Sequence, residues 1–551
     1  MPAPVTITFL GGLGEIGRNC AAVEIDNRIM LIDCGLMFPD LDMLGVDLVL
    51  PDFTYLYDNA DRIEGCVATH GHEDHTGGLS FLLRDISFPI FGSELTLGLA
   101  RNRIEEAGLL DRTEFIAVAD GERRKVGPFD LEFIPVTHSV PHGFATAFHT
   151  PQGVLLHSGD FKIDLQPVDG RLTDLSRMGA LASDPGIRLL LADSTNAEER
   201  GHSASESSVG QVLYDLFHAN EGRRIITACF ASHVHRVQQI ANAAMAFDRK
   251  VATLGLSMKK NVRLARRMGL LEIPDDVLID IEAIDDYPPE QVCIISTGSQ
   301  GEPMSALALM ANSDSKWLTL TTDDTVILSS HPIPGNEMNV SKVIDGLVRQ
   351  GVEVVYSGIA DVHATGHAKA EELRTFHSIT RPEWFIPVHG EYRHMVAHAK
   401  IARSMGMQSD HVWVCEDGAQ VQLTDDGLKA VGKVPSGYLF VDGTIGDVGH
   451  GVLRDRKVLA EEGVVVVIVT LDVDSGALIT APEIVTRGWV YEAEAEGLLA
   501  DCAAAVEKAV GEVKDPSDIE AVQRAARRAA GRFVNKETKR RPMIVPVVIE
   551  A

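Results

Sequence analysis

The sequence predicts an α/β protein with more than one domain. Its 551 residues are enough for two to four domains and a large apolar core. Residues 6–35 read as short strands and turns, residues 206–350 alternate regularly between strands and helices, and residues 450–551 combine helices with strands. The regular alternation is typical of a doubly wound, largely parallel sheet.

The elements are expected in the following order. Near the N-terminus, strands are expected at 6–10, 21–25 and 29–33, and a helix at 95–107. The glycines at 11–17 resemble a dinucleotide loop, but a strand follows them, so a turn is favoured. In the central part, helices are expected at 208–219, 235–247, 260–270 and 339–349, with strands at 224–230, 250–255, 292–296 and 325–329. After them we expect a helix at 369–378, a strand at 384–388, a helix at 392–405, and in the tail strands at 463–471 and 542–549 with helices at 498–513 and 519–533.

Composition narrows the class of protein. Apolar residues make up 45% and charged residues 23%, as in ordinary globular proteins. No apolar run reaches the length of a membrane span and no leader-like segment opens the chain, so a cytoplasmic protein is expected. The seven scattered cysteines read as reduced core residues. The net charge of −29 argues against broad coating of nucleic acid, but it is compatible with a nuclease that has a basic lining and divalent cations at a narrow site.

A histidine-rich turn dominates the sequence. His70, His72, Asp74 and His75 follow the strand-like residues 65–68 and precede a helix start at 76–79. Imidazole and carboxylate groups are ligands of Zn²⁺ and Mn²⁺. His70 and His72 alternate and can point the same way, whereas Asp74 and His75 can face a second ion. The alternative is a surface turn that is rich in histidine by chance.

The pattern His-x-His-x-Asp-His resembles the signature of the metallo-β-lactamase superfamily. The rest of the chain is similar to its RNA-processing β-CASP branch and, within that branch, to the ribonuclease J family. The resemblance implies an αββα sandwich formed by residues 1–205 and 351–430, an inserted doubly wound β-CASP domain at 206–350, a linker at 431–449 and a C-terminal α/β domain at 450–551.

The resemblance also implies a set of metal ligands. His138, which follows the strand-like residues 131–136, would be the third histidine on the first ion. Asp160 would bridge two ions, and His389 would complete the second site with Asp74 and His75. The cofactors would be two Zn²⁺ or Mn²⁺ ions. An aspartate at a strand end, such as Asp160, could instead cap the following turn, and Asp33 is expected to support the site rather than to bind metal.

Catalytic and RNA-binding residues are implied in the same way. Asp193 would orient His367, which would act with Asp74 in catalysis, although Asp193 could equally cap a turn. The loops expected to hold RNA and its 5′ phosphate contain Ser232, His233, Val234, His235, His363, Ala364, Thr365, Gly366 and His367. The family usually has aspartate, asparagine and serine where His142, His233 and His331 stand, so the roles of these three stay open.

Further features carry weaker expectations. Gly45, Asp47 and Asp442 match positions that bind a structural calcium ion in the family, although aspartates in loops are often simply solvated. The basic residues 258–267 flank an RNA channel or form a solvated face. Arg540 and Arg541 could contact RNA, or could protect an edge strand from aggregation.

The predicted function is a metal-dependent ribonuclease in RNA maturation and decay. The resemblance implies 5′→3′ exonuclease activity that prefers 5′-monophosphate ends, together with endonuclease activity. It also implies a homodimer or homotetramer formed by the C-terminal domain, contacts with other RNA-decay proteins and no membrane. The alternatives are a small-molecule hydrolase of thioesters or lactams, and a noncatalytic scaffold of an RNA-degrading complex.

Overall fold

The computed structural model describes residues 2–40, 42–333, 335–443, 445–491 and 495–551. The chain forms two compact units, one that contains Val49–Tyr438 with the residues up to Phe38, and one that contains Pro39–Leu48 with Leu439–Ala551. Among the described residues, no helix is long and apolar enough to cross a membrane. We describe each unit by itself.

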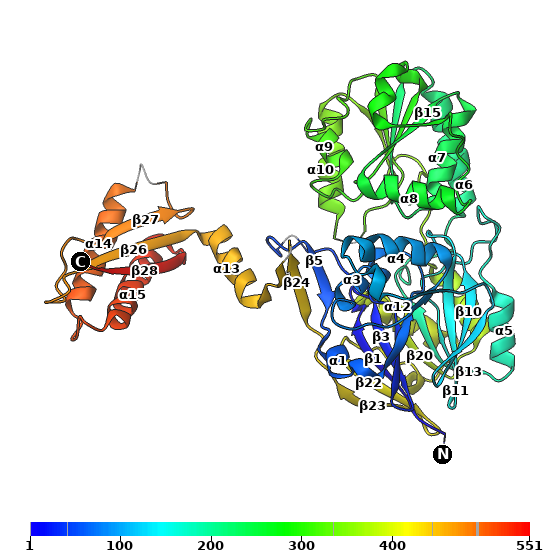
Figure 1. The fold of residues 1–551 in the computed structure, drawn as a ribbon, viewed down its shortest axis with the longest axis horizontal. Helices are drawn as coiled ribbons and strands as arrows, with labels where there is room; N and C mark the ends of the chain where they lie inside the picture. The colour runs from blue at the N-terminus through cyan, green and yellow to red at the C-terminus, as the bar shows by residue number, and fades with distance from the viewer. Residues whose placement is uncertain (1, 41, 334, 444, 492–494) are drawn as a thin grey trace. The chain divides into compact units, whose positions relative to one another are not determined.

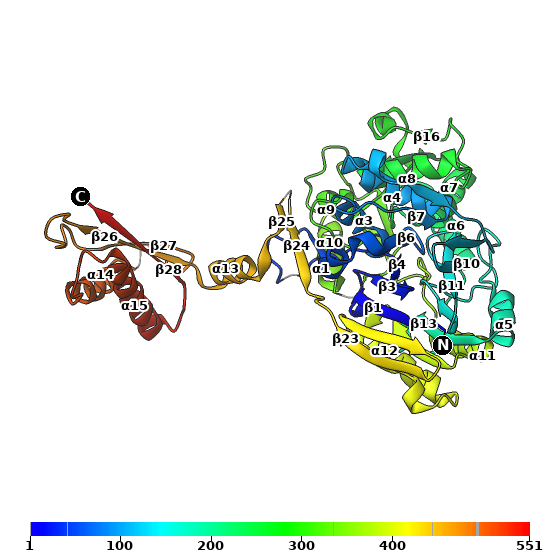
Figure 2. The same ribbon diagram turned by 60° about the horizontal axis from the view of Figure 1, so that its bottom comes forward.

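Two sheets pack face to face in the first unit (Figures 1 and 2). The eight-stranded sheet has the order β23-β22-β1-β3-β4-β6-β7-β8. Its strands are β1 (Val5–Gly11), β3 (Cys20–Ile25), β4 (Arg28–Ile32), β6 (Ile63–Val67), β7 (Ile90–Gly92), β8 (Phe115–Ala117), β22 (Ala419–Thr424) and β23 (Gly427–Lys433). The six-stranded sheet has the order β20-β13-β12-β11-β10-β9. Its strands are β9 (Arg123–Val126), β10 (Phe129–Val136), β11 (Gly143–Thr150), β12 (Gly153–His157), β13 (Ile187–Asp193) and β20 (Trp384–Val388).

An apolar core fills the space between these sheets. Ile7 and Val23 of the first sheet are buried in one cluster with Phe133, Leu189 and Ile386 of the second. A second apolar cluster joins the outer face of the six-stranded sheet to helices α5 (Leu175–Ser183), α11 (Ala370–Thr380) and α12 (Tyr392–Ser404). The central strands β1, β13 and β20 are buried along almost their whole length, whereas the edge strands β9 and β23 are partly exposed. The expected metallo-β-lactamase sandwich is therefore confirmed.

A third sheet of six parallel strands is inserted between β13 and β20, which are parallel neighbours. Its order is β16-β15-β17-β14-β18-β19. The strands are β14 (Arg224–Ala228), β15 (Lys250–Leu254), β16 (Leu278–Ile279), β17 (Val292–Ser296), β18 (Asp324–Leu328) and β19 (Glu353–Val355). One face packs on α6 (Glu206–Ala219), α7 (Val234–Ala246) and α8 (Leu256–Arg267), and the other on α9 (Ala306–Ala311) and α10 (Glu337–Arg349). This is the doubly wound parallel sheet that the alternation predicted, and its match to a β-CASP domain confirms what the family resemblance implied.

Short elements complete the first unit and its ends. They include β2 (Leu13–Gly14), β5 (Leu48–Pro51), β21 (Gly390–Glu391), α1 (Thr54–Asp58), α2 (Glu73–Thr76), α3 (Leu79–Leu82) and α4 (Glu94–Glu106). The 3₁₀ turns lie at Ala60–Arg62, Leu110–Arg112, Ile281–Asp286, Pro289–Gln291 and Ser409–His411.

The second unit is a small α/β domain. Its three-stranded sheet has the order β27-β26-β28, formed by β26 (Val464–Leu471), β27 (Glu483–Arg487) and β28 (Met543–Glu550). Helices α14 (Glu496–Gly511) and α15 (Ile519–Thr538) pack on one face of this sheet (Figure 2). The span 431–449, expected as a linker, instead contains the end of β23, then β24 (Tyr438–Asp442) and β25 (Ile445–Asp447), and helix α13 (Gly449–Glu462) begins within it.

Candidate metal centre and active site

Four strands of the six-stranded sheet deliver site residues at the same edge. β10 and β12 are both antiparallel to β11, and β12, β13 and β20 are mutually parallel, so all four point the same way. The residues that follow their carboxyl ends are His138, Asp160, Asp193 and His389. Gly159 is required before Asp160, because its φ is +58° and an added Cβ would lie 2.5 Å from the carbonyl oxygen of Phe144.

The histidine-rich turn approaches this edge from the eight-stranded sheet. It follows β6 and leads into α2, as its strand-turn-helix pattern predicted. Asp33, just after β4, fixes the turn: its carboxylate accepts hydrogen bonds from the Thr69 backbone N–H at 2.8 Å and from the Thr69 hydroxyl at 2.9 Å. The turn is therefore anchored to the neighbouring strand at the point where it leaves β6.

Three histidines and Asp160 form a first group of potential ligand atoms. His72 Nδ1 lies 3.0 Å from His70 Nε2 and 3.2 Å from His138 Nε2. Asp160 Oδ2 is 3.6 Å from His70 Nε2 and 3.9 Å from His138 Nε2. Because these ring nitrogens point toward one another at such distances, one cation can bind to all of them.

A second group shares the same carboxylate oxygen. Asp160 Oδ2 is 3.2 Å from His75 Nε2 and 3.6 Å from His389 Nε2. Asp74 Oδ2 is 3.5 Å from His75 Nε2 and 3.3 Å from His389 Nε2. In each group the ligand atoms lie within 4.8 Å of one another. Asp160 Oδ2 is thus placed between two potential cation positions, where a carboxylate can bridge two ions and offset their repulsion.

The other ring nitrogens of these histidines are held by outer contacts. His75 Nδ1 lies 2.7 Å from Asp33 Oδ2, and His138 Nδ1 donates to the carbonyl oxygen of Gly366 at 2.8 Å. His389 Nδ1 lies 2.7 Å from the Thr195 hydroxyl. Contacts of this kind fix the ring orientation and leave the inner nitrogen free to bind metal. Asp33 was expected as a supporting residue, but Thr195 was not singled out, because nothing in its local sequence points to His389.

Burial and charge favour a cation at the centre. Burial lowers the pKa of His72 to about 4 and keeps the pKa values of His70 and His138 well below the usual value, so these rings are neutral ligands at neutral pH. Burial also acts to lower the pKa of His389, but the carboxylates of Asp160, Asp193 and Asp74 together outweigh it and raise that pKa to about 10. The carboxylates therefore favour a positive charge on this side. The donor set fits two divalent ions.

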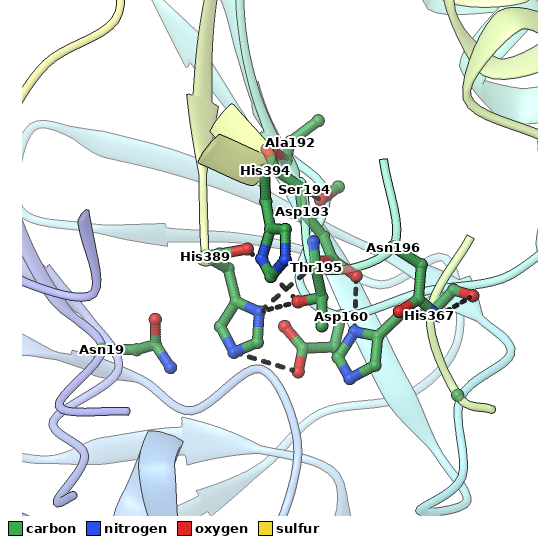
Figure 3. Close-up of polar contacts among 12 residues, drawn as sticks. Asn19, Asp160, Ala192, Asp193, Ser194, Thr195, Asn196, His367, His389 and His394 are labelled. Carbon is green, nitrogen blue, oxygen red and sulfur yellow. Dashed lines mark hydrogen bonds and ion pairs between the residues drawn. The ribbon is translucent and has the colours of Figure 1, made fainter. Parts of the chain in front are cut away.

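A carboxylate–imidazole pair, with Asp193 buried and His367 partly exposed, lies beside the centre (Figure 3). His367 Nδ1 is 2.7 Å from Asp193 Oδ2, and the His367 ring lies 5.0 Å from the ring of His138 and 5.4 Å from that of His389. Burial opposes ionisation of both partners, yet the imidazole charge lowers the pKa of Asp193 and the Asp193 carboxylate raises that of His367. The pair can hold a proton at the edge of the metal centre.

Comparison with known proteins identifies the family. Four family models match: the metallo-β-lactamase superfamily at residues 13–212, the β-CASP domain of ribonuclease J at 222–347, the RNA specificity domain of Zn-dependent metallo-hydrolases at 351–414 and the C-terminal domain of ribonuclease J at 451–551. The chain is 43% identical to ribonuclease J of Mycobacterium tuberculosis over 560 residues, covering 100% of this chain and 99% of the relative. The chain belongs to the ribonuclease J family.

Other ribonuclease J proteins agree with this assignment. Ribonuclease J2 of Bacillus subtilis is 38% identical over 549 residues, covering 99% of this chain and 98% of the relative. Ribonuclease J of Mycolicibacterium smegmatis is 42% identical over 558 residues, covering 100% and 98%. Together with the ligand groups, these relatives support a metal-dependent ribonuclease.

A solved structure shares only the fold. It is titled "Crystal Structure of a Protein of Unknown Function from Enterococcus faecalis V583" and aligns with a TM-score of 0.53 at 15% identity, covering 76% of this chain and all of that one.

The residues expected to contact RNA in this ribonuclease J family member divide into two sets. His233, Val234 and Ala364 have buried side chains, and His233 Nε2 lies 3.2 Å from the Glu206 carboxylate. Their side chains are therefore shielded from solvent, and their contact with RNA stays a prediction. His235 Nε2 lies 3.4 Å from Asp169 Oδ2.

The second set stays partly exposed. It comprises Ser232, His235, His363, Thr365 and His367, whereas the Gly366 carbonyl holds His138. The His363 ring stacks on that of His331 with 6.4 Å between centroids. Among the described residues, His142 belongs to neither ligand group; it adopts φ +62°.

The residues expected to bind calcium lie together in the second unit, but an arginine lies among them. Arg456 donates to the carbonyl oxygen of Gly45 at 2.9 Å and forms an ion pair with Asp442. Asp47 Oδ2 accepts the backbone N–H of Gly443 at 2.7 Å. The guanidinium supplies the positive charge that calcium would bring, so this arrangement does not fit a calcium ion.

Proposed function

We propose that this ribonuclease uses two Zn²⁺ or Mn²⁺ ions to hydrolyse RNA as a 5′→3′ exonuclease that prefers 5′-monophosphate ends, and that it also cuts internally. The observation that carries the proposal is Asp160 Oδ2, which lies within 3.2–3.9 Å of four histidine nitrogens from both ligand groups. We assign the first ion to His70, His72, His138 and Asp160, and the second to Asp74, His75, Asp160 and His389.

The bound ions would supply an activated water and neutralise the phosphate oxygens. The chain's own residues do the rest. Asp74 and Asp160 would hold the ions with their negative charge. His367, whose Nδ1 is held by Asp193, presents its Nε2 beside the centre and delivers a proton to the leaving 3′ oxygen. His367 is therefore the proposed general acid, and Asp193 is its positioning residue.

The preference for a 5′ monophosphate is assigned to the partly exposed set near the stacked His363 and His331. Hydroxyl and imidazole donors from Ser232, Thr365 and His363 suit a terminal phosphate. The buried Arg236 lies behind them and bonds the carbonyl oxygen of Val362. Its charge is paired with the buried Glu206 carboxylate, so Arg236 acts by holding the loop at Val362 rather than as a free positive charge.

The experiment uses one RNA, labelled near its 3′ end, that bears either a 5′ monophosphate or a 5′ triphosphate. Wild type with Mn²⁺ is expected to degrade the monophosphate RNA faster and to release mononucleotides, whereas chelator or His72→Ala stops cleavage. The His363→Ala variant is expected to cleave RNA still, but to degrade the monophosphate and triphosphate RNAs at the same rate. Equal rates on both RNAs in wild type would overturn the 5′ preference, and internal cuts alone would overturn the exonuclease part.

We also propose a homodimer or homotetramer formed through the C-terminal domain, which would bind other RNA-decay proteins. β28 is an edge strand that exposes Val547 and Ile549, and an apolar edge invites pairing with another chain. Light scattering of the full chain and of Val547→Lys would test this, with the variant expected to have the smaller mass. A monomeric wild type would refute it.

The domain assignment is likewise proposed as residues 1–205 and 351–430 for the hydrolase, 206–350 for the β-CASP domain, 431–449 as the connection and 450–551 for the C-terminal domain.

All seven cysteines are free and buried, which supports a cytoplasmic location.

A further inference from the structure

The C-terminal unit contains a cavity that the metal centre does not use. Its volume is about 790 Å³, and it lies between α13, α15 and the start of β28. Three arginines of α15 line it: Arg527, Arg528 and Arg532. Gly531, Met543 and Ile544 also line the cavity. The cavity thus combines a cationic rim with an apolar floor.

Helix α15 divides its two faces cleanly. Val522, Ala526 and Val534 are buried against the sheet. Arg527 and Arg528 lie three and four residues after Arg524, and Gly531 and Arg532 lie four residues after Arg527 and Arg528, so these five residues share one helix face. A glycine inside a helix costs about 1 kcal/mol relative to alanine. At Gly531 an added Cβ would meet only Ile544 Cγ1, at 3.8 Å, so the absence of a side chain leaves the cavity floor open.

The cavity arginines lack carboxylate partners. Over the described part of the chain, no ion pair joins Arg527, Arg528 or Arg532 to an acidic residue; the one contact among them is Arg532 Nε to the Arg528 carbonyl oxygen at 3.2 Å. Asp455 lines the cavity without such a pair. From Arg524 to Arg541 the sequence has eight basic residues and one acidic residue, which gives this segment a net charge of +7. The whole chain has a net charge of −29.

This concentration of charge points to a polyanion. Guanidinium groups bind phosphate oxygens in a bidentate manner, and exposed arginines with no internal partner are free to do so. The floor of Met543 and Ile544 offers apolar surface on which a nucleobase can rest. A second copy of this chain is a poor occupant, because a two-fold interface would bring the same arginines against one another.

We propose that the arginine cavity of α15 binds the phosphate backbone of single-stranded RNA, as a binding surface of the C-terminal domain separate from the residues of the metal centre. The proposal rests on the proposed ribonuclease function and adds to it a second contact with the substrate. Because the recognition is of phosphate, the binding is independent of RNA sequence and sensitive to salt.

The test measures binding of a labelled single-stranded RNA to the full-length protein by fluorescence anisotropy, in chelator so that no cleavage occurs. The double variant Arg527→Ala with Arg532→Ala is compared with Lys508→Ala with Lys514→Ala, which removes the same charge from exposed positions outside the cavity. The arginine variant is expected to bind about tenfold more weakly, with a salt slope reduced by about 1.4. The lysine variant is expected to retain most of the affinity.

A third variant separates the cavity from its charge. Gly531→Leu fills the floor, keeps every arginine and suits a helix, so it is expected to weaken RNA binding without lowering the Tm, whereas Gly531→Ala is expected to bind nearly normally. Cleavage of a 5′-monophosphate dinucleotide is expected to be unchanged in all variants, because none of the substituted residues belongs to the metal centre.

The outcomes are distinct. Equal affinities and salt slopes in the arginine variant and wild type would overturn the proposal. So would a change of oligomeric mass with unchanged RNA binding, because the surface would then join copies of the chain. Weaker RNA binding by the arginine variant, in a protein that cleaves no RNA, would retain the cavity and reject the proposed nuclease activity instead.

Discussion

Asp33 offers a direct perturbation of the metal centre at a residue that is not itself a proposed ligand. Its Oδ2 lies 2.7 Å from His75 Nδ1, and both side chains are buried. In Asp33→Asn the amide oxygen can still accept the Thr69 N–H, but an amide N–H₂ then faces the ring nitrogen that needs an acceptor. His75 loses its orientation and its charged partner. Loss of such outer contacts costs about 10–100-fold in metal affinity, equivalent to about 1.4–2.8 kcal/mol.

Metal affinity is measured by competition of the full-length protein with a chromophoric chelator. Asp33→Asn is expected to weaken the binding of one of the two ions by this factor. The control is Asp58→Asn, which removes a carboxylate at an exposed position at the end of α1. A variant that folds like wild type and binds both ions within about twofold of it would refute the role assigned to Asp33.

Three further predictions follow from the geometry. His367→Ala is expected to lower kcat for RNA by about 10²–10⁴ while leaving two bound ions per chain; an unchanged kcat would refute the general-acid assignment. Burial lowers the pKa of His377 to about 4, below its unfolded value, so the stability it contributes is complete above about pH 6.5 and is lost as pH falls toward about pH 4, by about 3 kcal/mol at about 1.4 kcal/mol per pKa unit. Denaturant melts over this range should show a smaller loss for His377→Gln, and an equal loss would contradict the assignment. Addition of Ca²⁺ to the metal-loaded protein is expected to leave the Tm unchanged because Arg456 already neutralises Asp442, whereas Arg456→Ala is expected to lower it; a wild-type Tm that rises with added Ca²⁺ would show that calcium binds after all.

The sequence could predict those site residues that follow buried strands. The histidine-rich turn is local, and Asp160, Asp193 and His389 each end an apolar run, so their position at a strand end could be inferred. The doubly wound insertion was equally readable, because its strands and helices alternate. The ligand groups depended on the family resemblance, since spacing alone does not say that four strands point the same way.

Other features depend on contacts between distant segments. The Thr195–His389 bond and the placement of Arg456 beside Gly45 join residues far apart in the chain, and neither partner has a local signal. Helix α13 was not predicted because it buries no residue in the described structure and therefore shows no apolar stripe. The burial of His233 against Glu206 follows from packing of α6 and the loop after β14, which the sequence does not reveal.

Asp160 provides the most direct test of the account. Metal content and cleavage of a 5′-monophosphate RNA would be measured together for wild type and Asp160→Asn, with Mn²⁺ and with chelator. The account predicts two ions per wild-type chain and cleavage that requires them, with both the ion content and the activity reduced in Asp160→Asn. RNA cleavage that persists in chelator, or a fully active Asp160→Asn, would contradict it.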